Sequence, residues 1–273
     1  MIRDITLGQY YQGDSVIHRL DPRVKLVATI VYIISLFLYK NSPIVYVLGF
    51  AFLALCISLS KVPVRFILRG LKAIVILLLI TALFNLLLTD GEIVFEIWKI
   101  HITKEGIENA VFIAIRLMLL IVGSSLMTLT TTPTQLTDGL EKLLRPLQKL
   151  HMPVHEVAMM MSIALRFIPI LLEETDKIMK AQMARGADFE SGNLIRKIKA
   201  LVPLLVPLFI SAFRRANDLA MAMEARCYQG GEGRTKMKPL IYRKRDAAAY
   251  LIVAAYLGIV IVAGKMLRIP LFI

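Results

Sequence analysis

Long apolar runs, separated by shorter polar connections, form the main pattern of this chain. The runs cover residues 24–38, 43–60, 71–88, 107–129 and 247–263. A membrane-spanning α-helix needs roughly 17 to 25 predominantly apolar residues, and the shortest run approaches that length when it is extended to 20–39. That run follows Asp21 and Pro22, which favour a helix start as N-cap and first helical residue. The pattern predicts an all-α, polytopic membrane protein with about five transmembrane helices.

Two further apolar stretches, 157–172 and 198–213, lie between the fourth and fifth runs. The first has Arg166 near its middle, with Pro169 close by, and the second contains two prolines. A central Arg costs at least ~2.5 to 3.5 kcal/mol on membrane-insertion scales, and prolines kink helices. We therefore expect both stretches to lie along the inner membrane surface or beneath the bundle. Two true crossings would leave the topology of the other runs unchanged, and they stay open as an alternative.

The helices that carry these stretches are expected to be longer than a bilayer crossing requires. They extend over 154–185 and 193–226, which corresponds to ~48 and ~51 Å at a rise of 1.5 Å per residue. A shorter amphipathic helix, 134–150, precedes them. The sequence thus predicts three parts: a membrane domain with four spans over 1–130, a cytoplasmic or interfacial unit of long helices over 131–245, and a C-terminal transmembrane helix over 246–273.

Charge places these parts relative to the membrane. The 33 Lys and Arg exceed the 20 Asp and Glu, for a net charge of +13, and the basic residues lie between and after the apolar runs. Cytoplasmic connections carry such an excess, so this placement fits membrane topology better than nucleic-acid binding. The connection with Lys61 and Arg65 is basic, whereas the connection with Asp90 and Glu92 is acidic. We expect a cytoplasmic N-terminus, a cytoplasmic central unit and an external C-terminus.

Sequence motifs for catalysis or nucleotide binding are absent. The chain has no Gly-x-x-x-x-Gly-Lys-Ser/Thr phosphate loop, no His-Glu-x-x-His pair and no Gly-x-Ser-x-Gly elbow. Its two cysteines, Cys56 and Cys227, offer neither a disulfide framework nor metal-ligand spacing. We therefore predict that the chain is not an enzyme by itself, has no cofactor or metal of its own, and depends on another chain for any use of ATP.

Both long helices are expected to end in the same short motif. Ala184-Arg185-Gly186 closes the first, and Ala225-Arg226-Cys227 closes the second at an offset of 41 residues. One interpretation is structural, because a cation at a helix C-terminus complements the helix dipole by a few tenths to ~1 kcal/mol and Gly186 supplies a left-handed stop. The other is docking, because a forked guanidinium suits carboxylates and carbonyls in a partner's groove. The repetition of the motif favours docking.

These motifs resemble those of the transmembrane T component of energy-coupling factor (ECF) transporters, a family with two Ala-Arg-Gly motifs at the tips of cytoplasmic coupling helices. The resemblance covers nearly the whole chain. It extends to residues 18–25 (His-Arg-Leu-Asp-Pro-Arg-Val-Lys), 165–169 (Leu-Arg-Phe-Ile-Pro) and 224–228 (Glu-Ala-Arg-Cys-Tyr), with a basic tail after the last. Cys227 departs from the family pattern, which puts the second helix stop in question more than the role of Arg226.

The resemblance implies both function and partners. The protein would transmit ATP hydrolysis by two ABC-type ATPase subunits to a separate substrate-binding S component, or to several, for vitamin or transition-metal uptake across the cell membrane of a prokaryote. ATP and Mg²⁺ would be bound by the ATPases, and Arg185 and Arg226 would each enter a groove on one of them. The alternative is a conventional ABC permease that binds its own substrate, which requires a polar cavity between spans that offer few polar residues.

Three other residues are candidates for structural or coupling roles. Arg116 lies inside the fourth apolar run, where a charge indicates function by default. A structural role is favoured, either a pairing with a carbonyl or an acid, or snorkelling from a span that starts later, near Ile113. Arg166 could anchor the helix crossing or bind lipid phosphates, and Pro169 belongs to the same motif. The basic stretch 234–245 precedes the last span, and its simplest interpretation is a positive-inside anchor that contacts anionic lipid.

Overall fold

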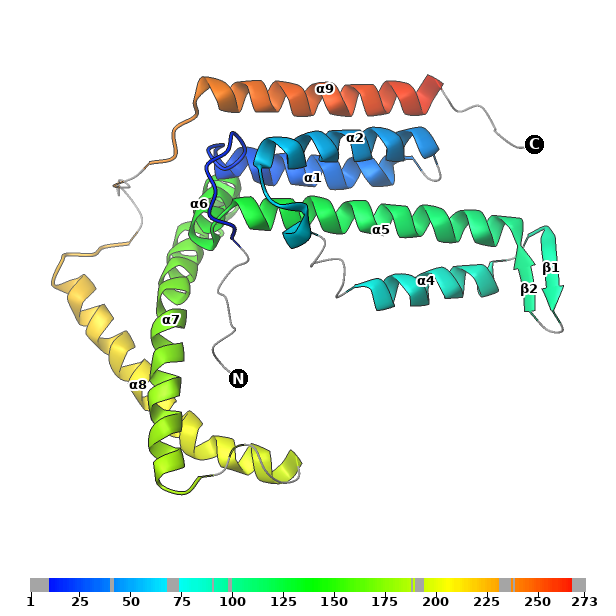
Figure 1. The fold of residues 1–273 in the computed structure, drawn as a ribbon. Coiled ribbons are helices and arrows are strands. Elements are labelled where there is room, and N and C mark those ends of the chain that lie inside the picture. Colours follow the sequence, from blue (N-terminus) through cyan, green and yellow to red (C-terminus); the bar gives the residue numbers. More distant parts are fainter. Residues whose placement is uncertain are drawn as a thin grey trace. The chain divides into compact units, whose positions relative to one another are not determined.

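The computed structural model describes residues 10–39, 42–67, 74–89, 91–97, 100–187, 189, 194–230, 237 and 239–266. These residues are helical almost throughout, which confirms the predicted fold class (Figure 1). The elements in chain order are α1 (Pro22–Leu38), α2 (Pro43–Ser60), α4 (Val75–Leu88), β1 (Ile93–Ile97), β2 (Ile100–Thr103), α5 (Lys104–Thr130), α6 (Pro133–Leu144), the 3₁₀ helix η1 (Arg145–Leu150), α7 (Val154–Ala184), α8 (Leu194–Glu224) and α9 (Lys244–Met266).

Two compact units divide the chain. The membrane unit comprises Gly8–Lys142 and Leu240–Ile273, and the long-helix unit is centred on Leu143–Pro239. The predicted division had placed residues 131–142 with the long helices. In the structure α6 packs on the start of α1 instead. Gly139 lies so close to Pro22 that a Cβ at Gly139 would be 3.0 Å from the Pro22 Cβ. Close contact at this glycine joins α6 to the membrane unit.

The core of the membrane unit lies between α1, α2, α5 and α9. The rings of Phe52 and Tyr256 stack with their centroids 4.3 Å apart, and the Tyr256 hydroxyl lies 2.8 Å from the Ser35 Oγ. Gly123 lets α5 approach α1 closely, since a Cβ there would lie 2.6 Å from the Tyr32 ring. Small and aromatic residues thus interlock across four helices, and every buried hydroxyl named here has a hydrogen-bond partner.

Polar contacts at the helix ends fix the directions of the helices. The Lys25 Nζ near the start of α1 donates to the Thr130 carbonyl at the end of α5 (2.7 Å), so these two helices are antiparallel. The Asp21 N–H at the start of α1 donates to Asp246 in the first turn of α9 (2.9 Å), so these two helices are parallel. Both directions agree with the topology predicted from the connection charges.

A short antiparallel hairpin, β1–β2, joins α4 to α5, and the hydrophobic pattern did not predict it. Its register pairs Glu96 with His101. The local sequence is rich in Ile and Val, which favour strands. The Thr103 hydroxyl donates to the Thr89 carbonyl (2.7 Å) and accepts from the Gly106 N–H (3.1 Å), so one side chain caps α5 and ties it to the end of α4. The prediction considered only the acidic charge of this connection.

Four helices within the described ranges are long and apolar enough to cross a membrane: α2, α5, α7 and the Lys244–Lys265 part of α9. This confirms a polytopic membrane protein. The helices α1 and α4 are shorter, with 17 and 14 residues, and residues 71–73 of the third predicted run lie outside the described residues. The helix α7 also satisfies the length and hydropathy of a span. The interfacial position expected for it therefore stays a prediction, with a membrane crossing as the alternative.

Large apolar side chains cover the outside of the membrane unit. Phe50, Leu79 and Leu251 are exposed by 64%, 65% and 70%. Such a surface would be costly in water, because contiguous apolar patches on soluble proteins are small. In a bilayer it faces lipid tails of the same polarity. The exposed surface therefore supports the same conclusion as the helix lengths.

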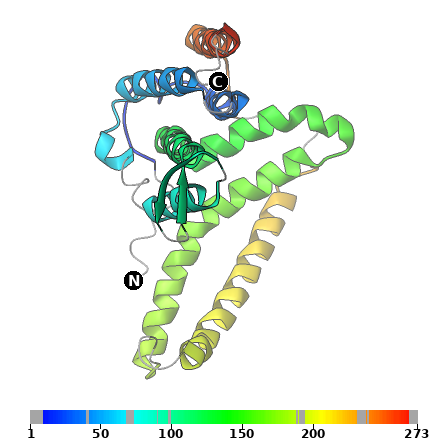
Figure 2. The ribbon, with the colours of Figure 1, turned by 90° about the vertical axis from the view of Figure 1, so that its right-hand side faces the viewer.

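The long-helix unit consists of η1, α7 and α8. Both α7 and α8 have 31 residues, or ~46 Å, and their bounds confirm the predicted long helices. They lie side by side along the C-terminal part of α7 (Figures 1 and 2). Pro169 lies inside α7, and Pro203 and Pro207 lie inside α8 without ending it. The predicted shorter helix 134–150 is α6 followed by η1, where Pro146 coincides with the change to 3₁₀ geometry.

Candidate docking site

The first Arg motif forms a complete Schellman cap at the end of α7. The Gly186 N–H donates to the Met183 carbonyl (2.9 Å), and the Ala187 N–H donates to the Gln182 carbonyl (3.0 Å). Gly186 has a φ of +88°, a left-handed conformation that glycine adopts without steric cost. The cap satisfies carbonyls that a helix end leaves without partners, and it stops α7 abruptly after Arg185.

The second motif repeats this cap at the end of α8. The Cys227 N–H donates to the Glu224 carbonyl (2.8 Å), and the Tyr228 N–H donates to the Met223 carbonyl (3.1 Å). Cys227 has a φ of +56°, so it takes the left-handed conformation that Gly186 takes in the first motif. Replacing Gly by Cys therefore does not alter the helix stop. It only adds the strain of a left-handed L-residue, about 1 to 2 kcal/mol.

Both motifs are exposed and their arginines are free. Within the described parts of the chain, neither Arg185 nor Arg226 forms an ion pair or a side-chain hydrogen bond. A guanidinium carries five N–H donors in a fixed fork, all of which are open to a partner here. The six exposed motif residues are Ala184, Arg185, Gly186, Ala225, Arg226 and Cys227.

A side-chain hydrogen bond ties the first tip to α8. Pro207 has no N–H, so the carbonyl of Pro203, one turn earlier, lacks its usual helical donor. The Gln182 Nε2 donates to this carbonyl at 3.4 Å. Because the Gln182 backbone also belongs to the first cap, one residue links the Arg185 tip to the middle of α8. Sequence reasoning missed Gln182, although two prolines four residues apart signal a carbonyl in need of a donor.

An ion pair fixes the same crossing further from the tip. The Arg215 Nη2 of α8 lies 3.0 Å from the Glu174 Oε2 of α7, and both side chains are partly exposed. The Arg215 Nε is buried without a hydrogen-bond partner in the described part of the structure. The two residues are 41 positions apart, the same offset that separates the Arg motifs. Together with Gln182, this pair sets the angle at which α7 and α8 cross, with the ends of the two antiparallel helices on opposite sides of the crossing (Figure 1).

Arg166 and Pro169 lie away from the tips. Both side chains are exposed, and both residues lie in the middle part of α7. Arg166 is separated from Arg185 by 19 residues, or ~28 Å along the helix. Pro169 deprives the Leu165 carbonyl of its helical donor. The structure therefore does not bring these two candidates together with the Arg motifs.

Arg116 is half-buried in α5 and contacts Tyr46, a core residue of the membrane unit. Its Nη2 and Nε donate to the Tyr46 hydroxyl at 2.6 and 3.0 Å, and its guanidinium carbon lies 5.3 Å from the centre of the Phe37 ring. The partner is thus a tyrosine hydroxyl and two aromatic rings rather than the carbonyl or acid that we expected. A phenol accepts hydrogen bonds without bringing a second charge into the bilayer, and aromatic faces attract cations.

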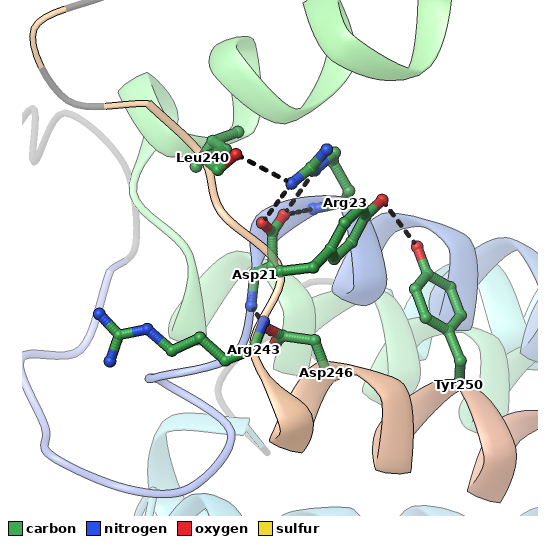
Figure 3. Close-up of polar contacts among 7 residues, drawn as sticks. Asp21, Arg23, Leu240, Arg243, Asp246 and Tyr250 are labelled. Carbon is green, nitrogen blue, oxygen red and sulfur yellow. Dashed lines mark hydrogen bonds and ion pairs between the residues drawn. The ribbon is translucent and has the colours of Figure 1, made fainter.

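A cluster that we call the N-terminal clasp, formed by Asp21, Arg23, Arg243 and Asp246, joins the starts of α1 and α9 (Figure 3). The buried Asp246 carboxylate accepts from the Asp21 N–H (2.9 Å) and from the Arg243 N–H (2.8 Å). These are the residues that precede α1 and α9, so one side chain satisfies a backbone donor at each helix start. The clasp joins positions 225 residues apart in sequence.

Arg23 completes the clasp. It binds the Asp21 carboxylate through its Nε (3.0 Å) and Nη2 (2.8 Å), donates to the Leu240 carbonyl (3.3 Å) and stacks on Tyr242 with 3.7 Å to the ring centre. Burial by itself would raise the pKa of the Asp21 carboxyl, but the hydrogen bonds from Arg23 outweigh it and leave that pKa below its usual value. Asp21 therefore remains an anion.

Known proteins resemble this chain over most of its length. Residues 13–237 match the family described as CbiQ, cobalt transport protein. The energy-coupling factor transporter transmembrane protein EcfT of Clostridium kluyveri is 58% identical over 254 residues, which is 92% of this chain and 93% of that protein. The proteins of the same name from Acidaminococcus fermentans and Bacillus subtilis are 54% and 50% identical, over 93% and 94% of this chain and 95% and 98% of their own lengths.

Proposed function

The chain belongs to the family of EcfT transmembrane proteins of energy-coupling factor transporters, and on this premise we propose that it carries ATP-driven movement from two ABC-type ATPase subunits to a separate substrate-binding S component. ATP and Mg²⁺ are bound by the ATPases, and this chain contributes no cofactor. The cargo is a vitamin or a transition-metal ion that the S component selects. One such module serves one or several S components in the cell membrane of a prokaryote.

A single observation carries the proposal: two helix tips 41 residues apart share one backbone cap and each presents a free, exposed Arg. A dipole role alone requires only a positive charge near the helix end. It does not require identical Schellman caps, nor a strained Cys227 that preserves the second one. Two equivalent tips suit two ATPase subunits, because each guanidinium fork can bind carboxylates or carbonyls in one groove.

The rest of α7 and α8 supplies a surface for the S component. Large apolar side chains are exposed along both helices, among them Met160 and Met161 on α7 and Phe209 and Phe213 on α8. Methionine side chains adapt to differently shaped partners, which suits a module that accepts more than one S component. The crossing held by Gln182 and Glu174 then links this apolar surface rigidly to the Arg tips.

A conventional permease would need a polar cavity for its own substrate. The cavity found between the helices of the membrane unit has mostly apolar walls, and its two charged lining residues are Lys25 and Arg245. Such walls suit a hydrocarbon chain rather than a polar micronutrient. This observation favours the coupling role over the permease alternative.

Substitution of the two tip arginines tests the docking. Arg185→Ala and Arg226→Ala each remove charge-assisted hydrogen bonds, so we expect about 10- to 100-fold weaker association with the ATPase subunits and a matching loss of uptake. Association is measured by co-purification from membranes that contain the complete transporter, and uptake is measured in the same cells. The amount of chain inserted in the membrane should not change.

Arg214→Ala is the matched control, since Arg214 is an exposed arginine of α8 that lies outside both motifs. We expect it to assemble and transport like the natural chain. Normal assembly and transport in the Arg185→Ala/Arg226→Ala double variant would refute the docking role.

A further inference from the structure

We propose that the cavity of the membrane unit is a binding site for one anionic phospholipid, with an acyl chain inside the cavity and the phosphate at Arg245. The cavity has a volume of about 290 Å³, near the lower end of the roughly 300 to 1,000 Å³ typical of ligand sites. It lies between α1, α2, α5 and α9 and includes neither Arg tip. The proposal is therefore independent of the docking role.

The inner part of the cavity is apolar. Its lining there includes Tyr32, Phe52, Gly123, Ala249 and Val253. From Arg245 to Val253 is eight residues of α9, so the lining extends ~12 Å along that helix from its basic start. A site with a charged end and an apolar interior of this depth matches an amphiphile better than a water-soluble ligand.

The cavity opens at the exposed apolar surface of the membrane unit. Leu55 of α2 and Ile252 of α9 belong to its lining, yet they are 52% and 53% exposed. These residues lie in helices that satisfy the length and hydropathy of membrane spans. An acyl chain can therefore enter sideways from the bilayer without passing through water.

Positive charge dominates the end of the cavity that lies at the starts of α1 and α9. Lys25 and Arg245 line it, and Lys25 already donates to the carbonyls of His18 (3.2 Å) and Thr130 (2.7 Å). The Arg245 Nε is buried and has no hydrogen-bond partner among the described residues. A buried N–H of this kind is costly to leave unsatisfied. The other N–H groups of this partly exposed guanidinium also have no ion pair or hydrogen bond in the described part of the chain, and they are the donors that a phosphate oxygen would bind while supplying a compensating charge.

The nearby acidic groups are already engaged. Asp21 pairs with Arg23, and both Asp246 oxygens accept backbone N–H groups in the N-terminal clasp. Neither carboxylate forms an ion pair with Arg245 in the described part of the chain. This end of the cavity therefore favours a headgroup with a net negative charge over a zwitterionic one.

The acyl chain and the headgroup make different contributions. A lipid tail that leaves the bilayer gains little from the hydrophobic effect, because the bilayer interior is already apolar. What the cavity offers the tail is van der Waals contact with apolar walls from four helices. Selectivity among lipids must therefore come from the charge at Arg245, which makes that residue the first to test.

Native mass spectrometry of the full chain provides the test. The purified protein, in mild detergent, is mixed with equal amounts of phosphatidylglycerol and phosphatidylcholine that carry the same acyl chains. We expect one phosphatidylglycerol to be retained in preference to phosphatidylcholine. Arg245→Gln, which keeps a polar side chain but removes the guanidinium and its charge, should retain about tenfold less phosphatidylglycerol.

Three further variants separate the site from general attraction to anionic lipid. Arg243→Gln removes the same charge two positions away and should bind like the natural chain. Arg243 contributes only its backbone N–H to the clasp, its side chain points away from the other clasp residues in Figure 3, and it does not line the cavity. Ala249→Phe fills the cavity and should abolish retention although Arg245 is intact, with Ala28→Leu as a second filling variant if the first does not fold. Equal retention of both lipids, equal loss in Arg243→Gln and Arg245→Gln, or normal retention in both filling variants would each overturn the proposal.

Discussion

At the level of single residues, Gly186 and Cys227 occupy equivalent left-handed positions with unequal cost. We expect Cys227→Gly to stabilise the α8 cap and Gly186→Ala to destabilise the α7 cap, each by about 1 to 2 kcal/mol, because only glycine adopts this conformation without strain. Hydrogen exchange of the Tyr228 and Ala187 amides measures the two caps directly, since these amides close the 6→1 hydrogen bonds.

Gly258→Ala is the control for both substitutions. Gly258 lies in α9, and a Cβ there would have no neighbour within 4 Å. The change should be neutral or slightly stabilising, as expected for alanine in a helix. Slower exchange at Ala187 in Gly186→Ala would contradict the assignment of strain to these positions.

His18 gives the membrane unit a dependence on pH. Burial lowers the pKa of its imidazole, and the hydrogen bond between its Nε2 and the Tyr11 carbonyl (3.1 Å) only partly offsets this effect. A lowered pKa means that the unfolded chain binds the proton more readily than the folded one. The contribution to stability is therefore complete above the unfolded value of about 6.5 and declines as the pH falls below it.

We accordingly expect the unfolding temperature of the detergent-solubilised chain to fall between pH 7.5 and pH 5, and part of that fall to disappear in His18→Gln. The exposed His151, substituted in the same way, should leave the pH profile unchanged. An identical profile in His18→Gln and the natural chain would show that His18 is not the group responsible.

Among the elements, α1 and α9 depend on one buried carboxylate at their shared end. Asp246→Asn keeps one acceptor oxygen but loses the charge and turns an amide group towards a backbone N–H. We expect a loss of about 1.5 to 3 kcal/mol in the stability of the membrane unit, the usual range for a hydrogen bond to a charged group. Thermal unfolding in detergent measures it.

Asp218→Asn serves as the matched change, because Asp218 is an exposed carboxylate of α8. It should leave the unfolding temperature within error of the natural chain. If Asp246→Asn were equally neutral, the clasp would contribute nothing to the pairing of α1 with α9.

The long helices show how far an element can be predicted from its residues. Their bounds followed from apolar periodicity and from the Arg motifs that end them, because backbone hydrogen bonds within a helix are local. The way they cross did not follow. It depends on the Pro203 carbonyl, which Pro207 leaves without a donor, and on Gln182, which is placed to reach it.

At the scale of the whole molecule, the proposed orientation in the membrane is testable with the two natural cysteines. Cys227 is exposed at the second tip, and Cys56 is half-buried in α2. We expect a membrane-impermeant maleimide to label the chain in inside-out vesicles but not in intact cells, because both tips are proposed to face the cytoplasm.

Cys227→Ser provides the control and should abolish the labelling, since Cys56 is half-buried in the apolar helix α2, where it packs against the core of the membrane unit. Labelling of intact cells at Cys227 would reverse the proposed topology. It would leave the internal architecture of the two units unaffected.

The sequence by itself determined which segments are helical, where the long helices end, how successive helices alternate in direction and where the two arginines lie. These features depend on run length, helix caps and connection charge, all of which are local. Only the tertiary structure decided which distant polar groups meet: Arg116 with Tyr46 across 70 residues, and Asp246 with Asp21 across 225. It also showed that Cys227 holds the same cap as Gly186. Such pairings depend on packing, which brings together residues that no local pattern connects.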